Sequence, residues 1–180
     1  MSSPAVATAA TASLFRRFRR NRRGSAAVEF ALVAPVFFAL LFAIIETAIV
    51  FFASQVLETI SQNSARMILT GQAQTAAYTQ AQFKTYVCGQ IPALFNCNNI
   101  YVDVESYSSF TNVVINSQID NSGNFINNMQ YSPGGPGDIV VVRLFYQWPM
   151  FVTGLGYNIA NLSGNMRLLV ATAAFRNEPY

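Results

Sequence analysis

Apolar residues dominate one continuous stretch near the start of the chain. It begins at Phe30, ends at Ala53 and covers 24 residues with a single charge, Glu46. A helix of that length rises about 36 Å, whereas the hydrocarbon core of a bilayer is about 30 Å thick. A secretory signal has an apolar core of only about 7 to 15 residues, so the stretch predicts a retained transmembrane helix. Pro35 lies inside it and is expected to kink the helix.

The helical pattern continues beyond the apolar stretch. Apolar or small residues recur there at three- and four-residue intervals, with polar residues between them; the recurring set is Val56, Leu57, Ile60, Ser64, Met67 and Ile68. We therefore expect one continuous helix over residues 26–70, which stops at Gly71. A second helix is predicted over residues 73–86, and its candidates for burial are Ala77, Ala81, Phe83 and Tyr86.

Beyond residue 100 the pattern changes to the alternating and β-branched residues that are typical of strands. Four strands are predicted, over residues 100–107, 110–119, 138–148 and 166–176. Residues 120–137 are rich in Asn, Ser, Gly and Pro and are expected to form a long surface loop. A second connection contains Trp148, Pro149 and the segment 154–156, whose aromatic and apolar residues lie either on the sheet or on the membrane surface.

The order of these elements predicts an α+β fold. A long N-terminal transmembrane helix continues into a folded head, which adds a second helix and an antiparallel sheet of about four strands. The expected organisation is a basic leader over residues 1–24, a transmembrane helix over 25–54 and an exported α+β domain over 55–180.

Charge is distributed unevenly along the chain. Six of the eleven basic residues precede Gly24: Arg16, Arg17, Arg19, Arg20, Arg22 and Arg23. Positive charge beside a span is retained in the cytoplasm, so we expect a single-pass protein with a cytoplasmic N-terminus and an exported C-terminal domain. Beyond Gly24, five basic residues face eight acidic ones, which leaves a net charge of −3. This balance argues against nucleic acid as a partner.

Both cysteines, Cys88 and Cys97, lie in the part that we expect to be exported. In that compartment disulfides persist, so the pair is interpreted as a disulfide; two free buried thiols are the alternative. The chain has no histidine, so a four-ligand zinc site would need carboxylates or a second chain. We expect no metal and no cofactor.

Catalytic residue sets are sparse. Nucleophilic triads usually need histidine, which leaves only a Ser-Lys arrangement through Lys84. Asp103 and Glu105 share a face of a predicted strand; this spacing fits a pair of catalytic carboxylates, but is more often a solvated face. The glycines at 134, 135 and 137 lack the Lys-Ser or Lys-Thr partner of a phosphate-binding loop. We therefore expect neither an enzyme nor a small-molecule substrate.

The residues around Gly24 resemble the processing site of type IV prepilins. In that family a peptidase cuts after a glycine that follows a basic leader, and the fifth residue of the mature chain is a glutamate; Gly24, Ser25 and Glu29 match these positions. Two residues depart from the usual pattern. Ser25 stands where a large apolar residue is common, so amine methylation does not follow from the resemblance, and Phe30 stands where tyrosine is frequent.

Within that superfamily the chain is similar to the TadE-like pseudopilins of the tight-adherence pilus system. The residues that carry this resemblance are Val28, Glu29, Phe30, Ala31 and Leu32, then Pro35 and Glu46, and finally Arg176, Asn177, Glu178, Pro179 and Tyr180. The resemblance implies a minor pilin or pseudopilin of the bacterial inner membrane with a periplasmic head. The implied partners are a prepilin peptidase, the inner-membrane platform of the pilus machine, other pilins or pseudopilins, and the membrane.

The two glutamates of the helix receive separate interpretations. Cleavage after Gly24 would leave the Ser25 amine at a helix N-terminus, where Glu29 neutralises it or meets the amine of a neighbouring subunit. The alternative for Glu29 is a counter-ion to Arg22 or Arg23. Glu46 would be protonated, directed outward, placed near the outer interface, or facing a protein partner, and we favour the partner.

A second function class is also open. The chain would then be an uncleaved, membrane-anchored periplasmic scaffold of the same pilus secretion machine, and Gly24 would remain joined to Ser25. A third class, a tethered periplasmic hydrolase, is disfavoured by the missing catalytic residues.

Overall fold

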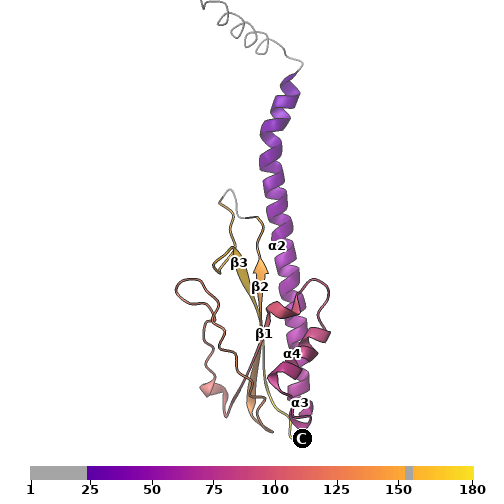
Figure 1. The fold of residues 1–180 in the computed structure, drawn as a ribbon, viewed down its shortest axis with the longest axis vertical. Helices are drawn as coiled ribbons and strands as arrows, with labels where there is room; N and C mark the ends of the chain where they lie inside the picture. The colour runs from indigo at the N-terminus through magenta and orange to yellow at the C-terminus, as the bar shows by residue number, and fades with distance from the viewer. Residues whose placement is uncertain (1–23, 153–155) are drawn as a thin grey trace, which may run out of the picture. The chain divides into compact units, whose positions relative to one another are not determined.

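The computed structural model of the chain describes residues 24–152 and 156–180. Its elements, in chain order, are helices α2 (Ser25–Leu69), α3 (Gln72–Thr75) and α4 (Gln80–Gly89), a short 3-10 helix η2 (Cys97–Asn99), strand β1 (Ile100–Tyr107), a second 3-10 helix η3 (Phe110–Asn112), and strands β2 (Ile139–Pro149) and β3 (Met166–Arg176). Figure 1 shows the strands beside the later part of α2, with α3 and α4 near the same part of the helix. The predicted α+β class is confirmed.

Helix α2 is one continuous helix of 45 residues, as the sequence predicted, and it passes through Pro35 without interruption. Buried residues recur along it as a stripe at three- and four-residue spacing: Ala43, Glu46, Val50, Ala53, Leu57, Ile60, Ser64 and Ile68. Ser61 and Ala65, next to this stripe, are buried as well. The predicted stripe is confirmed for Leu57, Ile60, Ser64 and Ile68, while Val56 and Met67 are half-buried at its margin. Burial therefore begins at Ala43, within the apolar stretch.

The predicted second helix is divided into α3 and α4. At the break, Ala77 adopts a positive φ of 50°, and its N–H donates to the Gln74 carbonyl at 3.0 Å. Tyr78 N–H donates to the Ala73 carbonyl, which completes a Schellman ending for α3. Thr79 then starts α4 through a capping box with Gln82. These two local signals override the apolar spacing that predicted a single helix.

The break changes which residues of this region are buried. Phe83 is completely buried as predicted, Tyr86 is half-buried, and the predicted burial of Ala77 and Ala81 is wrong because both are exposed. Val87, one turn after Phe83, is completely buried instead.

The sheet has three antiparallel strands in the order β1-β2-β3. These strands lie where three of the four predicted strands were placed. Strands β1 and β3 have the predicted bounds, and β2 begins and ends one residue later than predicted. One face of the sheet packs against α2 and α4 and forms the main core. Its strand residues alternate along the chain, as Val102 and Val104 of β1 do, and as Val140, Val142 and Leu144 of β2 do.

The predicted strand over residues 110–119 is wrong. It begins as the 3-10 helix η3 and continues as an irregular segment in which Val114 and Ile115 are exposed by 59% and 63%. A strand there would need a free sheet edge, and the outer edge of β1 is already occupied. Val104 donates to the Gln130 carbonyl at 2.9 Å and accepts from Ser132 N–H at 2.8 Å. Because Gln130 and Ser132 hold that edge, the β-branched residues of segment 110–119 do not pair with β1.

The loop over residues 120–137 supplies these edge contacts, so it is a surface loop that closes β1. Its glycine-rich end is held in place by the chain's last residues. Asn177 is buried, and its side-chain amide donates to the carbonyls of Pro133 and Gly135 at 2.9 and 3.0 Å. Beyond it, Glu178 N–H donates to the Leu69 carbonyl at the end of α2. Asn177 and Glu178, two of the C-terminal residues that resemble TadE-like proteins, thus join the loop over residues 120–137 to the end of α2.

Candidate functional site

The first part of α2 is apolar on every side. The large apolar residues from Val28 to Phe42 are all exposed, with values such as 69% for Phe30 and 73% for Leu32. Among the described residues, 24–42 belong to one structural unit and those from Ala43 onward belong to a second. By length and composition, the helix could cross a membrane. An apolar surface that surrounds a helix is suited to lipid or to other apolar helices, and unsuited to water.

The residues of the predicted processing site lie at the start of this helix. Gly24 is exposed and immediately precedes Ser25, the first residue of α2. A Cβ atom added to Gly24 would meet no atom within 4 Å. Glu29 is exposed one turn further along the helix. The six arginines of the predicted leader lie outside the described residues, so the expected cytoplasmic position of the N-terminus stays a prediction.

The predicted membrane segment has different surroundings at its two ends. Phe30 and Pro35 are exposed, whereas Ala53 is completely buried in the core of the head. The packed head therefore starts about ten residues before Ala53, at Ala43. The outer limit of the membrane helix itself stays a prediction.

Glu46 is 7% exposed and is bound by backbone groups of the connection after β2. Phe151 N–H donates to its Oε1 at 2.5 Å, and Val152 N–H donates to its Oε2 at 3.0 Å. One residue along the helix, the Thr47 hydroxyl forms a hydrogen bond with the Tyr157 hydroxyl. Glu46 is thus bound by backbone groups of its own chain, an arrangement that sequence reasoning missed. The separate protein partner that we favoured for Glu46 stays a prediction.

Cys88 at the end of α4 and Cys97 at the start of η2 are joined by a disulfide, with their Cα atoms 5.7 Å apart. The bond closes the segment that leads from α4 into β1. Phe95 within that segment packs on Tyr146 and Trp148 of β2, with ring centroids 4.9 and 6.0 Å away. The disulfide thus holds the second helical region close to the beginning of the sheet.

Asp103 and Glu105 do not form a solvated face or a free pair of carboxylates, because both bind Arg143. The Arg143 Nη2 atom lies 2.6 Å from Asp103 Oδ2 and 2.9 Å from Glu105 Oε1. Asp103 also accepts a hydrogen bond from Gln130 N–H at 2.7 Å. Glu105 accepts one from the Tyr107 hydroxyl, and burial together with this carboxylate raises the pKa of Tyr107.

This arrangement stabilises structure and leaves no free general acid or base at that position. Within residues 24–152 and 156–180, no group of three or more His, Cys, Asp or Glu side chains could hold a metal ion. The signal that sequence reasoning missed was Arg143 itself, the single charged residue of strand β2.

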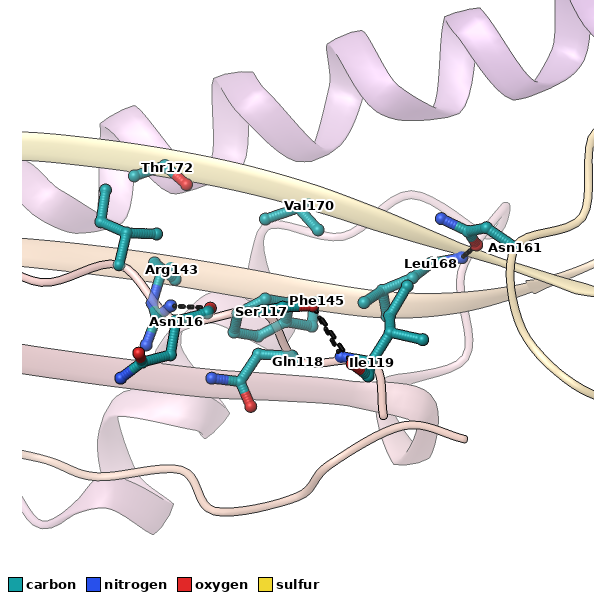
Figure 2. Close-up of a pocket in the computed structure, with 11 residues that line it drawn as sticks. Asn116, Ser117, Gln118, Ile119, Arg143, Phe145, Asn161, Leu168, Val170 and Thr172 are labelled. Atoms are coloured by element: carbon teal, nitrogen blue, oxygen red, sulfur yellow. Dashed lines mark hydrogen bonds between the residues drawn. The ribbon is translucent and has the colours of Figure 1, made fainter. Parts of the chain in front are cut away.

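The outer face of the sheet carries a small cavity of about 190 Å³ between β2, β3 and the segment 115–119. Figure 2 shows Phe145 beside Ser117 and Leu168 near Ile119, with the hydrogen bond from Arg143 Nη1 to the Asn116 carbonyl drawn as a dashed line. The only charged side chain in the lining is Arg143, which is already paired. The cavity therefore offers a mainly apolar hollow and no reactive group.

These features define an α+β protein with a disulfide-linked head and an N-terminal helix that could span a membrane. The sequence profile of the family described as TadE-like protein matches residues 24–66, which covers the exposed apolar helix and most of its packed continuation. No curated protein and no solved structure matches the chain. The match confirms the resemblance to TadE-like proteins, and this family suggests a part in tight-adherence pilus assembly.

Proposed function

We propose that this protein is a minor pilin or pseudopilin that helps to assemble a tight-adherence pilus. The observation that carries the proposal is the apolar helix surface from Val28 to Phe42, exposed on all sides and located within the TadE-like match. In a membrane this surface is solvated by lipid, and in an assembled pilus it packs between the helices of other subunits. TadE-like pilus proteins are structural, so the protein is proposed to have no catalytic activity of its own.

The proposed processing step is peptide cleavage between Gly24 and Ser25 by a prepilin peptidase. That bond lies at the start of α2, and Gly24 is exposed. The basic leader would hold the bond at the cytoplasmic face, and the head would lie in the periplasm. The proposed partners are this peptidase, the inner-membrane platform and other pilus subunits.

N-terminal mass spectrometry of the protein isolated from membranes tests this proposal. A mature chain that begins at Ser25 is expected, and the same spectrum reports whether its amine is methylated. A matched variant, Gly24→Val, is expected to remain uncleaved. Because an added Cβ atom at Gly24 meets no atom within 4 Å, a block would report on the peptidase rather than on the fold.

The uncleaved scaffold remains the competing function, and the same experiment separates the two. Mature protein that begins at Met1, with normal piliation, would contradict the pilin proposal and support the scaffold. Mature protein that begins at Ser25 would contradict the scaffold.

A further inference from the structure

The last residue of β2 and the three residues that follow it form a short tip, Pro149–Val152, whose side chains differ in burial. Met150 is buried, with 7% of its surface exposed, and Trp148, two residues earlier, is equally buried. Phe151 is exposed by 81%, more than any other large apolar residue among those described. The tip is therefore anchored in the core by its neighbours while a single phenyl ring points outward.

Glu46 fixes this tip to one level of α2. Its carboxylate accepts from the backbone N–H groups of both Phe151 and Val152, at 2.5 Å and 3.0 Å for the shortest contact of each. The Thr47–Tyr157 hydrogen bond ties the far side of the same connection to the same turn of the helix. The depth of Phe151 relative to the membrane therefore follows from the depth of Glu46.

The length of the apolar helix limits that depth. A 30 Å hydrocarbon core takes about 20 helical residues. If the span starts at Ala26, it ends beside Glu46; if it ends at Ala53, Glu46 lies about 10 Å inside its outer boundary. Ile49, Phe51 and Phe52, exposed by 42%, 68% and 62%, show that the apolar surface extends past Glu46. In either register, the tip lies at or below the outer edge of the hydrocarbon core.

We propose that the tip inserts Phe151 into the outer leaflet of the membrane that α2 crosses. The occupant of this surface is lipid at the boundary between acyl chains and headgroups, where aromatic rings are favoured. The two backbone donors satisfy the Glu46 carboxylate at a depth where water is scarce. The inference rests on the proposed membrane anchoring, and it adds a second contact that fixes the height of the head above the bilayer.

Depth measurement with nitroxide labels tests the inference in the full chain. Single cysteines replace one residue at a time, with the Cys88–Cys97 disulfide kept, and the purified protein is placed in phosphatidylethanolamine and phosphatidylglycerol vesicles without other proteins. The variants are Phe151→Cys at the tip, Phe37→Cys on the apolar helix and Val114→Cys on the head, where the native residues are exposed by 81%, 57% and 59%. Collisions with oxygen report lipid, and collisions with a water-soluble nickel complex report water.

The expected order of depth is Phe37 deepest, Phe151 in the interfacial layer and Val114 in water. A label at Phe151 that is as open to nickel as the label at Val114, while the label at Phe37 is in lipid, overturns this inference and leaves the anchor intact. A label at Phe37 in water overturns the anchor itself. Shielding at Phe151 that disappears when the protein is diluted in lipid assigns the tip to a second copy of the chain, and also overturns the inference.

Discussion

Arg143 of β2 and Asp103 of β1 are directly opposite each other in the sheet, and the Arg143 Nη2 atom lies 2.6 Å from Asp103 Oδ2. Both side chains are almost completely buried. Two charges that are removed from water need each other, because an isolated charge in this position is costly. The pair also holds the edge of the sheet, since Asp103 accepts from Gln130 N–H and Arg143 donates to the Asn116 carbonyl.

The first prediction concerns this pair. Arg143→Met is expected to lower the free energy of unfolding by about 3 to 5 kcal/mol, because it leaves the Asp103 carboxylate buried without a cation. The double variant Asp103→Leu with Arg143→Met is expected to lose clearly less, because it leaves no buried charge. Urea unfolding of the full chain in detergent, followed by near-ultraviolet circular dichroism, measures both. A single variant that is as stable as the native protein would contradict the assignment.

Several parts of the fold could be predicted because the deciding interactions are local. The stripe through Leu57, Ile60 and Ile68 follows from helical spacing alone. Strands β1 and β3 follow from alternation and from clear turn residues at their ends. Prediction failed where a tertiary contact opposed the local preference of a segment for helix or strand. Residues 110–119 favour a strand, but Gln130 and Ser132 occupy the edge that it would have joined.

For the candidate site, sequence reasoning reached only residues that are close together in the chain, and their role in processing stays a prediction. Gly24, Ser25 and Glu29 are a short motif, whereas the contact between Glu46 and Phe151 joins residues 105 positions apart. No spacing rule connects a helix carboxylate with backbone donors so far along the chain. The same holds for Arg143 and Asp103, 40 positions apart, whose pairing depends on the strand register.

A pH prediction follows from Tyr131. Burial raises the pKa of its phenol from 10.0 to about 12, with a smaller contribution from Tyr78, and its hydroxyl has no hydrogen-bond partner among the described residues. The folded state favours the protonated phenol, so this contribution to stability is complete below pH 10 and is lost as the pH rises from 10 towards 12.

Tyr131→Phe is therefore expected to leave stability unchanged or slightly higher at pH 7, because the ring can still pack on Phe83 and no hydrogen bond is removed. It is also expected to reduce the loss of melting temperature between pH 9 and pH 11. Tyr180→Phe, at an exposed tyrosine, is the control and should retain the native alkaline loss. Identical pH profiles for Tyr131→Phe and the native protein would rule out this account.

Another prediction compares two glycines. Gly71 ends α2 with a φ of 74°, and an added Cβ would lie 2.4 Å from carbons of the Tyr180 ring. Gly71→Ala is expected to cost about 1 to 2 kcal/mol from the backbone alone, and to displace Tyr180. Gly89→Ala has no atom within 4 Å at the end of α4, so it is expected to stabilise by up to about 1 kcal/mol. Thermal unfolding of both variants checks the opposite signs.

The Tyr180 contact can be separated from the backbone term. In a Tyr180→Ala background, Gly71→Ala is expected to keep the backbone cost and lose the steric part. If Gly71→Ala has no cost in this background, the whole cost in the native protein comes from the clash with the Tyr180 ring.

The disulfide gives a prediction about compartment as well as stability. Protein isolated without reductant is expected to show no alkylated thiol at Cys88 or Cys97 by mass spectrometry. The double variant Cys88→Ser with Cys97→Ser is expected to lower the free energy of unfolding by about 2.5 to 3 kcal/mol, the chain-entropy value for a loop of this length. Two freely alkylated thiols in freshly isolated protein would argue against export to an oxidising compartment.

The last prediction concerns Glu29, exposed near the start of α2. If cleavage places a charged amine on Ser25, the helix N-terminus and this amine both favour a nearby anion, and Glu29 lies one turn away. Glu29→Gln keeps the size of the side chain and removes its charge, so membrane insertion and cleavage are expected to continue. Docking of each subunit is expected to weaken by about 1 to 1.4 kcal/mol, or roughly five- to tenfold.

Loss of pili with normal amounts of processed protein is therefore the expected result, measured by electron microscopy of cells together with N-terminal mass spectrometry. Glu58→Gln is the matched control, because it removes a charge from the same helix at a half-buried position of the head, where Glu58 accepts a hydrogen bond from Gln62 in the next turn. That variant should retain native piliation. If Glu29→Gln cells carry as many pili as the control, Glu29 is a residue of the membrane interface alone, and the uncleaved scaffold becomes the stronger account of the protein.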